Sequence, residues 1–383
     1  MKIAYITNTD PTDLHSWSGL TYYISQALEK AKNEIIYIQV ASPKVGPILK
    51  LKQKLYPKIT GKFIQPNRYP SFYNQYSASI KNALKNLSNV DFLFSDSSEL
   101  IALASGNLPK AFWVDASFAG IVNYYQEFSL LHKQTIRQGN KLEQKAYDNA
   151  TLVFFASEWA ASTARANYKI DEAKIKIVPF GANLSGIPTE SEIKKVIKNK
   201  QIETCKLLFS GVDWNRKGGP LALEITEKLN KSEIKTQLII SGCKPFTAGT
   251  EPSYVKQIGF LSKKNPEQKK IYETLFNEAH FLLVPSQAEC YGLVYCEANA
   301  YGLPALATKT GGIPTIIKDE VNGKTFELNA SVDEYVSFIK KYFLDANLYQ
   351  DLSYKSYQAY TNNLNWDVAG KKVSKILSEH TIG

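Results

Sequence analysis

Two glutamates flank the expected start of a helix in the C-terminal half of the chain. Glu289 and Glu297 are separated by seven residues, with Gly292 and Leu293 between them. An apolar run at 281–285 predicts a buried strand, and the helical pattern after Gly292 ends at a Gly-Leu-Pro sequence. The first amides of a helix have no intrahelical acceptor and carry the positive end of its dipole, so this start suits a phosphate. One carboxylate could then bind sugar hydroxyls and the other the hydroxyls of a nucleoside.

The same pattern has a structural alternative. Glutamate is common in helices, and Glu289 and Glu297 would then be two solvated carboxylates on a capped helix. The position of the pair, between a predicted strand and a defined helix stop, favours the nucleotide-sugar interpretation.

A second charged group lies in a glycine-containing loop after the strand predicted at 206–210. Gly211 opens this loop, and Arg216 and Lys217 precede the next helix. Two cations there could neutralise a pyrophosphate and stabilise it as a leaving group. Positive charge at a helix start is unfavourable with the helix dipole, which favours a functional explanation over a plain basic loop.

Two further candidates follow strands in the first half of the chain. Gly19 lies after the strand predicted at 3–7 and before the helix predicted at 20–30, where a plain tight turn explains one glycine equally well. Asp115 follows the strand predicted at 111–114. Its carboxylate could bind a sugar hydroxyl or orient an acceptor nucleophile, and an N-cap of the following helix is an equal alternative.

Length and composition bound the class of protein. At 383 residues, with 44% hydrophobic and 21% charged residues, the chain predicts two globular domains. The sequence has no run long enough for a transmembrane helix, and its first residues predict a strand and not a signal peptide. The four cysteines form no Cys-x-x-Cys pair, so we expect reduced thiols in a cytoplasmic protein and no zinc site.

Strand and helix patterns alternate along the whole chain, which predicts α/β domains with parallel sheets. Two halves that each open with a strand predict two Rossmann-like domains facing a central cleft, with the site at the carboxyl ends of the strands. Residues 189–200 are polar and predict a linker or a surface helix. The further strands are predicted at 35–40, 92–95, 152–156, 238–241 and 305–307, and the further helices at 133–149, 220–230, 267–279, 293–300, 332–343 and 366–379.

The segment around Glu289 and Glu297 resembles the Glu-x7-Glu motif of the retaining glycosyltransferases of family 4 (glycosyl transferases group 1), which have the GT-B fold. The resemblance is specific over roughly 206–315 and looser before that. It implies an acceptor-binding domain at 1–185, joined by the C-terminal helix 366–383, and a donor-binding domain at 186–365. It also implies a metal-independent hexosyltransferase of carbohydrate biosynthesis that uses a nucleoside diphosphate sugar.

The resemblance assigns roles to the candidate residues. It implies that Glu289 binds the transferred sugar, that Glu297 binds the ribose and that Arg216 and Lys217 bind the pyrophosphate. Gly292, Leu293, Tyr291, Gly211 and Gly19 would line the donor site, with Asp115 as a catalytic residue. The chain departs from the family in three places: Arg216 and Lys217 are adjacent and not about five residues apart, Gly19 stands alone where two glycines are common, and Asp115 stands near where many members carry a histidine.

No Asp-x-Asp sequence occurs, so we expect no metal and no cofactor beyond a UDP- or GDP-sugar as donor substrate. The acceptor could be a carbohydrate, a lipid-linked molecule or a protein, and no motif indicates nucleic-acid binding. Two alternatives remain: another GT-B enzyme, such as a phosphorylase or a nucleotide-sugar epimerase, and a non-catalytic GT-B scaffold.

Residues 44–62 carry six lysines and no acid, interleaved with apolar residues, in a chain of net charge +10. This segment fits an ordinary solvated surface, and the alternative is a peripheral contact with the inner face of a membrane. Pro47 and Pro57 are expected to limit a helix here to roughly two or three turns.

Overall fold

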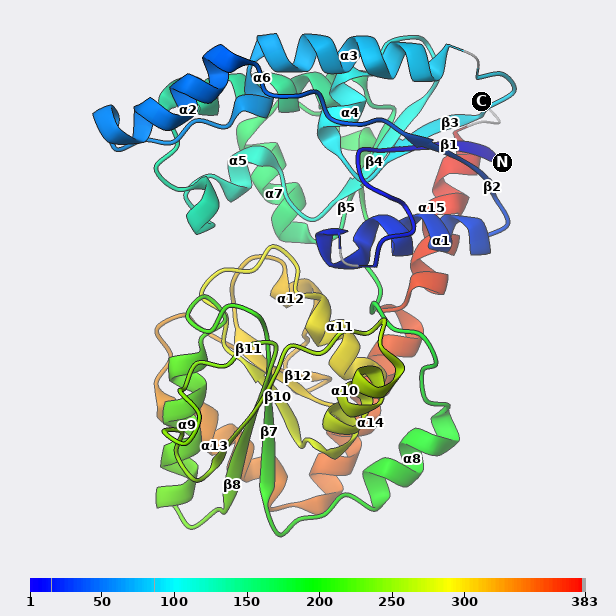
Figure 1. Ribbon diagram of the computed structural model, residues 1–383. Helices are drawn as coiled ribbons and strands as arrows, with labels where there is room; N and C mark the ends of the chain where they lie inside the picture. The colour runs from blue at the N-terminus through cyan, green and yellow to red at the C-terminus, as the bar shows by residue number, and fades with distance from the viewer. Residues whose placement is uncertain (15, 86, 381–383) are drawn as a thin grey trace. The chain divides into compact units, whose positions relative to one another are not determined.

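The computed structural model describes residues 1–14, 16–85 and 87–380. The chain divides into two compact units, one formed by Met1–Pro179 with Trp366–Gly383 and the other by Phe180–Asn365 (Figure 1). Both are parallel α/β layers, so the predicted α/β class is correct. The predicted cleft between the two units stays a prediction.

The first unit is built on a six-stranded sheet of order β2-β1-β3-β4-β5-β6, in which all neighbouring strands are parallel. Its strands are β1 (Lys2–Thr7), β2 (Glu34–Gln39), β3 (Phe92–Ser95), β4 (Lys110–Val114), β5 (Leu152–Phe155) and β6 (Ile175–Ile177). Its helices are α1 (Leu20–Lys30), α2 (Pro47–Thr60), α3 (Pro70–Leu84), α4 (Ser98–Leu103), α5 (Phe118–Ile121), α6 (Lys133–Asn149), α7 (Glu158–Asn167) and α15 (Trp366–Glu379).

The C-terminal helix α15 packs on α1 within this unit. The ring of Trp366 is stacked on Tyr23, with centroids 6.1 Å apart, and lies edge-on to Trp113 of β4 at 5.7 Å. A Cβ on Gly370 would lie 2.2 Å from the carbonyl oxygen of Ala27, so only glycine permits this close approach of the two helices.

The second unit has a six-stranded parallel sheet of order β12-β11-β10-β7-β8-β9. Its strands are β7 (Cys205–Ser210), β8 (Thr236–Ser241), β9 (Val255–Gly259), β10 (Phe281–Val284), β11 (Ala305–Thr308) and β12 (Gly323–Phe326). Its helices are α8 (Glu190–Lys198), α9 (Gly219–Lys231), α10 (Pro266–Glu278), α11 (Leu293–Ala300), α12 (Ile313–Ile316), α13 (Val332–Phe343) and α14 (Ala346–Asn362). β10 is buried along its whole length, as its unbroken apolar sequence predicts.

Two expectations from the sequence are resolved here. Residues 189–200 form a helix and not a linker, because Thr189 and Glu192 make a capping box at the start of α8. The expected limit of two or three turns at 44–62 is wrong, since α2 runs for 14 residues. Pro47 lies in the first turn, where its missing N–H has no role, and Pro57 lies in the last turn.

Among the described residues, no helix combines the length and the apolar character needed to cross a bilayer.

Candidate functional site

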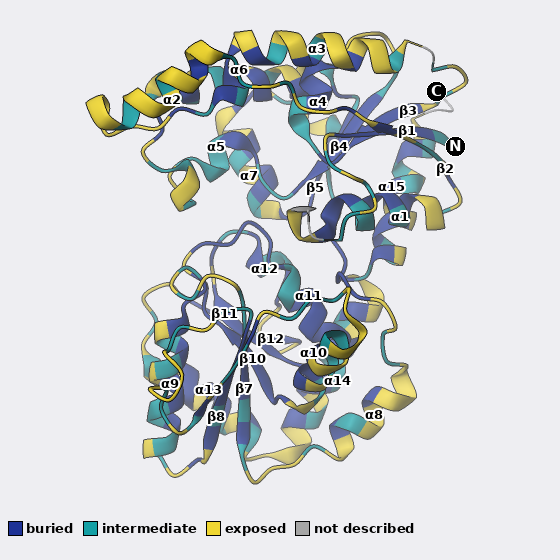
Figure 2. Cartoon of the chain, viewed as in Figure 1, coloured by how far each residue is buried: buried dark blue, intermediate teal, exposed yellow. Residues whose placement is uncertain are grey.

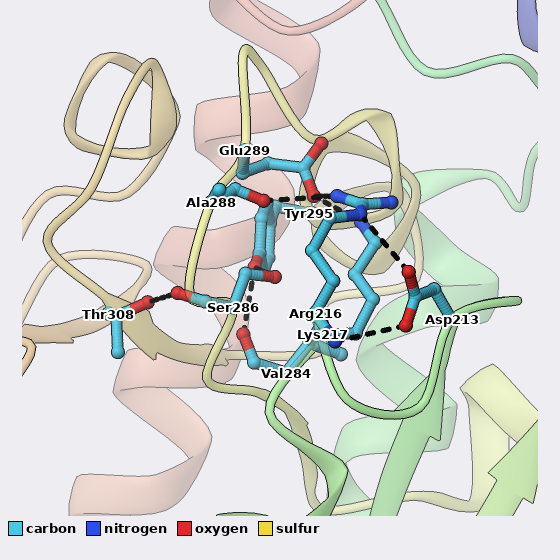
Figure 3. Close-up of polar contacts among 9 residues, drawn as sticks. All are labelled: Asp213, Arg216, Lys217, Val284, Ser286, Ala288, Glu289, Tyr295 and Thr308. Carbon is cyan, nitrogen blue, oxygen red and sulfur yellow. Dashed lines mark hydrogen bonds and ion pairs between the residues drawn. The ribbon is translucent and has the colours of Figure 1, made fainter. Parts of the chain in front are cut away.

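The loops that follow β7 and β10 lie together at the carboxyl edge of the second sheet. β10 pairs with β7 in parallel, so both strands end on the same side. The amide of Gln287 donates to the carbonyl of Arg216 at 2.7 Å, and Nη1 of Arg216 donates to the carbonyl of Ala288 at 3.0 Å. These two bonds tie one loop to the other and bring the predicted cations beside the first predicted glutamate (Figure 3).

Both cations converge on one carboxylate oxygen. The ammonium of Lys217 donates to Oε2 of Glu289 and makes an ion pair with it. Nη1 of Arg216 lies 3.6 Å from the same oxygen. Lys217 and Glu289 are both buried, with 9% and 8% of their surface exposed. Glu289 is therefore not the solvated helix carboxylate of the structural alternative, because a buried charge requires a partner such as these.

Asp213 holds Arg216 from the other side. Its Oδ1 accepts a hydrogen bond from the amide of Arg216 at 3.0 Å, and its Oδ2 lies 3.6 Å from the guanidinium Nε. The guanidinium thus spans Asp213, the carbonyl of Ala288 and the Glu289 carboxylate. Lys217 makes its ion pair with Glu289 alone among the described residues. Arg216 therefore has more protein partners than Lys217.

Three glycines give these side chains room. Gly218 has a φ of +78°, and a Cβ there would lie 1.9 Å from the carbonyl oxygen of Pro285, so glycine lets the first loop pass directly over the end of β10. A Cβ on Gly211 would lie 2.9 Å from the stem of Lys217. Gly292, the N-cap of α11, has a φ of +96° and little space toward Tyr295 and Glu289.

Tyr291 and Leu293 flank that glycine. The Tyr291 side chain is buried, and its hydroxyl donates to the carbonyl of Phe180 at 2.7 Å. A donor contact from Tyr291 would therefore have to come from its backbone. Leu293 is the first residue of α11, where the helix amides lack intrahelical acceptors.

Glu297 lies inside α11 and is also buried, with 5% exposed surface. Its Oε1 accepts from the ammonium of Lys263, and its Oε2 accepts from the hydroxyl of Tyr272. Lys263 also donates to the carbonyl of Asn183 at 3.2 Å. Burial, and next the neighbouring Glu297 carboxylate, hold the pKa of Tyr272 well above its ordinary value, so this hydroxyl remains a donor.

Sequence reasoning did not identify Lys263 and Tyr272. Both lie more than 20 residues before Glu297, on the loop after β9 and on α10, and neither stands in a motif. The one available signal was the position of Lys263 shortly after the Ile258-Gly259-Phe260 segment at the carboxyl end of a strand.

Asp115 and Gly19 belong to the first unit. Asp115 follows β4 and is half-buried, but the N-cap of α5 is Ser117, whose side chain accepts from the amide of Gly120. The capping alternative for Asp115 is therefore wrong. Gly19 is the N-cap of α1 with a φ of +83°, and a Cβ there would lie 2.9 Å from the carbonyl oxygen of Leu14.

A buried carboxyl that the sequence did not indicate lies at the same edge of the first sheet. Asp96 follows β3, is 7% exposed and accepts a hydrogen bond from the hydroxyl of Thr21 at the start of α1. Burial raises the pKa of Asp96 from 3.8 to about 6, although the Thr21 hydrogen bond opposes the shift.

Comparison with known proteins finds a family model that matches part of the chain. Residues 190–359 match the family model described as glycosyl transferases group 1. A D-inositol 3-phosphate glycosyltransferase of Xylanimonas cellulosilytica is 25% identical over 198 residues, which cover 47% of this chain and 46% of that protein. The chain therefore aligns with about half the length of that relative.

Two solved structures share the fold over nearly the whole chain. Sucrose-phosphate synthase from Thermosynechococcus elongatus superposes with a TM-score of 0.70 at 16% identity, covering 100% of this chain and 99% of that chain. Anabaena Alr3699/HepE, in complex with UDP and glucose, superposes with a TM-score of 0.62 at 15% identity, covering 99% of each chain. These likenesses confirm the predicted GT-B fold.

Proposed function

Residues 190–359 form a domain of the glycosyl transferases group 1 family, and on that premise we propose that the protein is a retaining, metal-independent glycosyltransferase. It transfers a sugar from a nucleoside diphosphate sugar to an acceptor hydroxyl. The observation that carries the proposal is the convergence of Lys217 and Arg216 on Glu289 beside the first turn of α11.

The two cations bind the diphosphate of the donor. A diphosphate carries more negative charge than a carboxylate, so it competes with Glu289 for Lys217 and Arg216. The amides at Leu293 and the following residue add further donors from the start of α11. The same groups stabilise the charge that develops on the diphosphate as it leaves, which is the electrostatic contribution expected of such a site.

Once the diphosphate pairs with the cations, the Glu289 carboxylate is released to accept hydrogen bonds from the hydroxyls of the transferred sugar. Glu297 takes the ribose hydroxyls in the same way, with Lys263 and Tyr272 orienting its two oxygens. In this assignment the two glutamates bind opposite ends of one donor, and α11 carries the contacts between them.

Retention follows from a reaction on one face of the sugar. The bond between the anomeric carbon and the diphosphate oxygen breaks, and the acceptor oxygen bonds to the same face of that carbon. The acceptor proton passes to the leaving phosphate oxygen. We assign no covalent nucleophile, because a reaction on one face, with the leaving phosphate as the proton acceptor, retains the configuration without one. Asp115 is assigned to the acceptor, as a group that binds or orients its hydroxyl.

Metal independence is supported by the two cations and the helix amides, which supply the positive charge that a divalent ion would otherwise provide. The UDP and glucose named for HepE support a UDP-sugar as donor, with a GDP-sugar as the other candidate. The acceptor is a carbohydrate, a lipid-linked molecule or a protein.

The test is thermal unfolding in the presence of UDP, GDP, ADP and their sugar conjugates, with a chelator in every sample. A ligand at about 100 times its dissociation constant stabilises a protein by ~2.7 kcal/mol, which gives a clear shift of the unfolding temperature. A shift with one base that survives the chelator supports the donor class and the metal-free site. The anomeric configuration of the product, followed by NMR, then tests retention. No shift with any nucleotide, together with a shift with inorganic phosphate, would favour a phosphorylase instead.

A further inference from the structure

One face of helix α2 exposes a row of large apolar side chains. Ile48, Leu51, Leu55 and Ile59 are 72%, 57%, 40% and 76% exposed. Their spacing of three, four and four residues places them in one stripe along the helix. Figure 2 shows most of α2 exposed. An exposed apolar row of this length is unusual for a surface helix, whose apolar stripe ordinarily faces the core.

The core side of α2 is a different face. Leu49 is the buried residue of the helix, and Tyr56 packs against the same hydrophobic core of the first unit. The exposed stripe therefore takes no part in the contacts that hold α2 on the domain. Substitutions in the stripe can be made without removing those contacts.

Two more large apolar side chains are exposed on segments outside α2. Phe63 is 50% exposed and its amide donates to the carbonyl of Leu130 at 2.8 Å, while Leu130 is itself 53% exposed. We call these six residues the α2 apolar patch: Ile48, Leu51, Leu55, Ile59, Phe63 and Leu130. They come from two segments that the chain holds side by side.

Lysines border the α2 apolar patch. Lys44, Lys50, Lys52, Lys54, Lys58 and Lys62 are the only charged residues from 44 to 62. Within the part of the chain that the structure describes, none of the six makes an ion pair with a carboxylate. On the helical wheel, Lys52 lies on one side of the stripe and Lys54 and Lys58 lie on the other.

We propose that the α2 apolar patch and its lysines form a docking surface for an anionic lipid bilayer. The helix lies in the plane of the interface, with its apolar row at the boundary between headgroups and acyl chains and its lysines among the anionic headgroups. Charge complementarity decides the occupant. A second copy of the chain would bring six more lysines against these six, and like charges oppose such a contact. This inference does not depend on the transferase activity.

The experiment is co-sedimentation of the full chain with two kinds of vesicle, phosphatidylcholine alone and phosphatidylcholine with about 30% phosphatidylglycerol. Each is measured at low salt and at about 0.5 M salt, because high salt screens the attraction between lysines and anionic headgroups. We expect binding to the anionic vesicles, loss of most of it at high salt, and little binding to neutral vesicles.

Two pairs of variants separate the contributions. Lys54→Gln with Lys58→Gln should weaken partitioning about thirtyfold, since each lysine near an anionic surface contributes ~1 kcal/mol. Ile48→Gln with Ile59→Gln should weaken it by at least roughly tenfold, because the apolar contact is lost. The matched controls are Lys195→Gln with Lys198→Gln on α8, and Ile202→Gln, whose side chain is 67% exposed. The controls should bind as the parent chain does.

Three results would overturn the proposal. One is absence of binding to anionic vesicles at low salt. Another is equal weakening by the α8 controls, which would make the effect one of net charge alone. The third is a self-association, seen by sedimentation velocity without vesicles, that the Ile48→Gln and Ile59→Gln pair abolishes while vesicle binding persists. Thermal unfolding of each variant guards against loss of the fold.

Discussion

The ammonium of Lys217 donates to the carboxylate of Glu289, 72 residues further along the chain, and both groups are buried. The cation expected to bind the donor phosphates is thus paired with the glutamate expected to bind the donor sugar. In the proposed function, donor binding replaces this ion pair with a contact between Lys217 and the diphosphate and with hydrogen bonds from sugar hydroxyls to Glu289. Each partner would therefore influence the affinity of the other's ligand.

Glu289→Gln should separate diphosphate binding from transfer. The amide no longer pairs with Lys217 and Arg216, so we expect the affinity for UDP to rise about three- to tenfold, which corresponds to about 1 kcal/mol. Turnover should fall by about 10²-fold or more, because a contact with the reacting sugar is lost. Isothermal titration with UDP and initial rates with the UDP-sugar measure the two effects.

The matched control is Glu278→Gln, which removes the carboxylate that pairs with Lys206 at 2.7 Å elsewhere in the same unit. It should leave both quantities unchanged. Unchanged or weaker UDP binding by Glu289→Gln, in a protein that still unfolds cooperatively, would refute the competition between the carboxylate and the diphosphate.

Lys217→Met should lower kcat/KM more than Arg216→Met does. Lys217 has the Glu289 carboxylate as its one ionic partner in the described chain, whereas Arg216 is also bound to Asp213 and to the carbonyl of Ala288. We expect a loss of about 10²- to 10³-fold for Lys217→Met, as for removal of one donor to a developing negative charge.

Steady-state kinetics of the two variants, with Lys217→Arg as a partial rescue, measure this difference. Lys228→Met on α9, which breaks the exposed pair with Asp333, is the control and should keep parental rates. Equal losses for Arg216→Met and Lys217→Met would show that the two cations share the charge.

Lys263→Met should weaken only the binding of the nucleoside part of the donor. It removes the ammonium that holds Oε1 of the buried Glu297, so we expect UDP to bind roughly tenfold more weakly while pyrophosphate binds as before. Lys217→Met, by contrast, should weaken the binding of both UDP and pyrophosphate. Competitive binding of UDP and pyrophosphate distinguishes the two variants.

The exposed Lys256 on β9 supplies the control substitution, Lys256→Met, which should alter neither ligand. If Lys263→Met weakens the binding of pyrophosphate as strongly as the binding of UDP, Lys263 belongs to the phosphate half of the site.

Asp96 predicts a pH-dependent stability in the first unit. Its pKa is about 6 in the folded chain against an ordinary value of 3.8, so the folded protein keeps a proton that the unfolded chain loses between these values. The free energy of unfolding therefore falls as the pH rises from about 4 to about 6, by at most about 3 kcal/mol from this group, and stays lower above.

Asp96→Asn should remove this fall. The variant should match the parent near pH 4 and exceed it in stability above pH 6, as measured by urea unfolding across the range. Asp148→Asn, an exposed aspartate on α6, should keep the parental profile. A fall of equal size in Asp96→Asn would assign the pH dependence to other groups.

Local patterns predicted the regular elements where apolar spacing was strong. Helices α1, α11, α13 and α15 have the predicted bounds, and the buried strands β3 and β10 lie where apolar runs place them. Helix α14 was missed because tyrosines and serines fill much of its buried face, so no apolar stripe marks it. The strands β6 and β12 are as short as β3 and β10 or shorter, but polar residues interrupt them, so no apolar run marks them.

The sequence alone determined the α/β class, through strand and helix patterns that alternate along the chain, and the glutamate pair around Gly292, which lies in one short continuous segment. Tertiary structure decided that Arg216 and Lys217 share the carboxylate of Glu289, and that Lys263 and Tyr272 share that of Glu297. These contacts depend on the order β10-β7-β8-β9, which brings together strand ends that are far apart in the chain. Burial of both carboxylates likewise follows from packing, since both side chains would be solvated if the segment 289–297 were isolated.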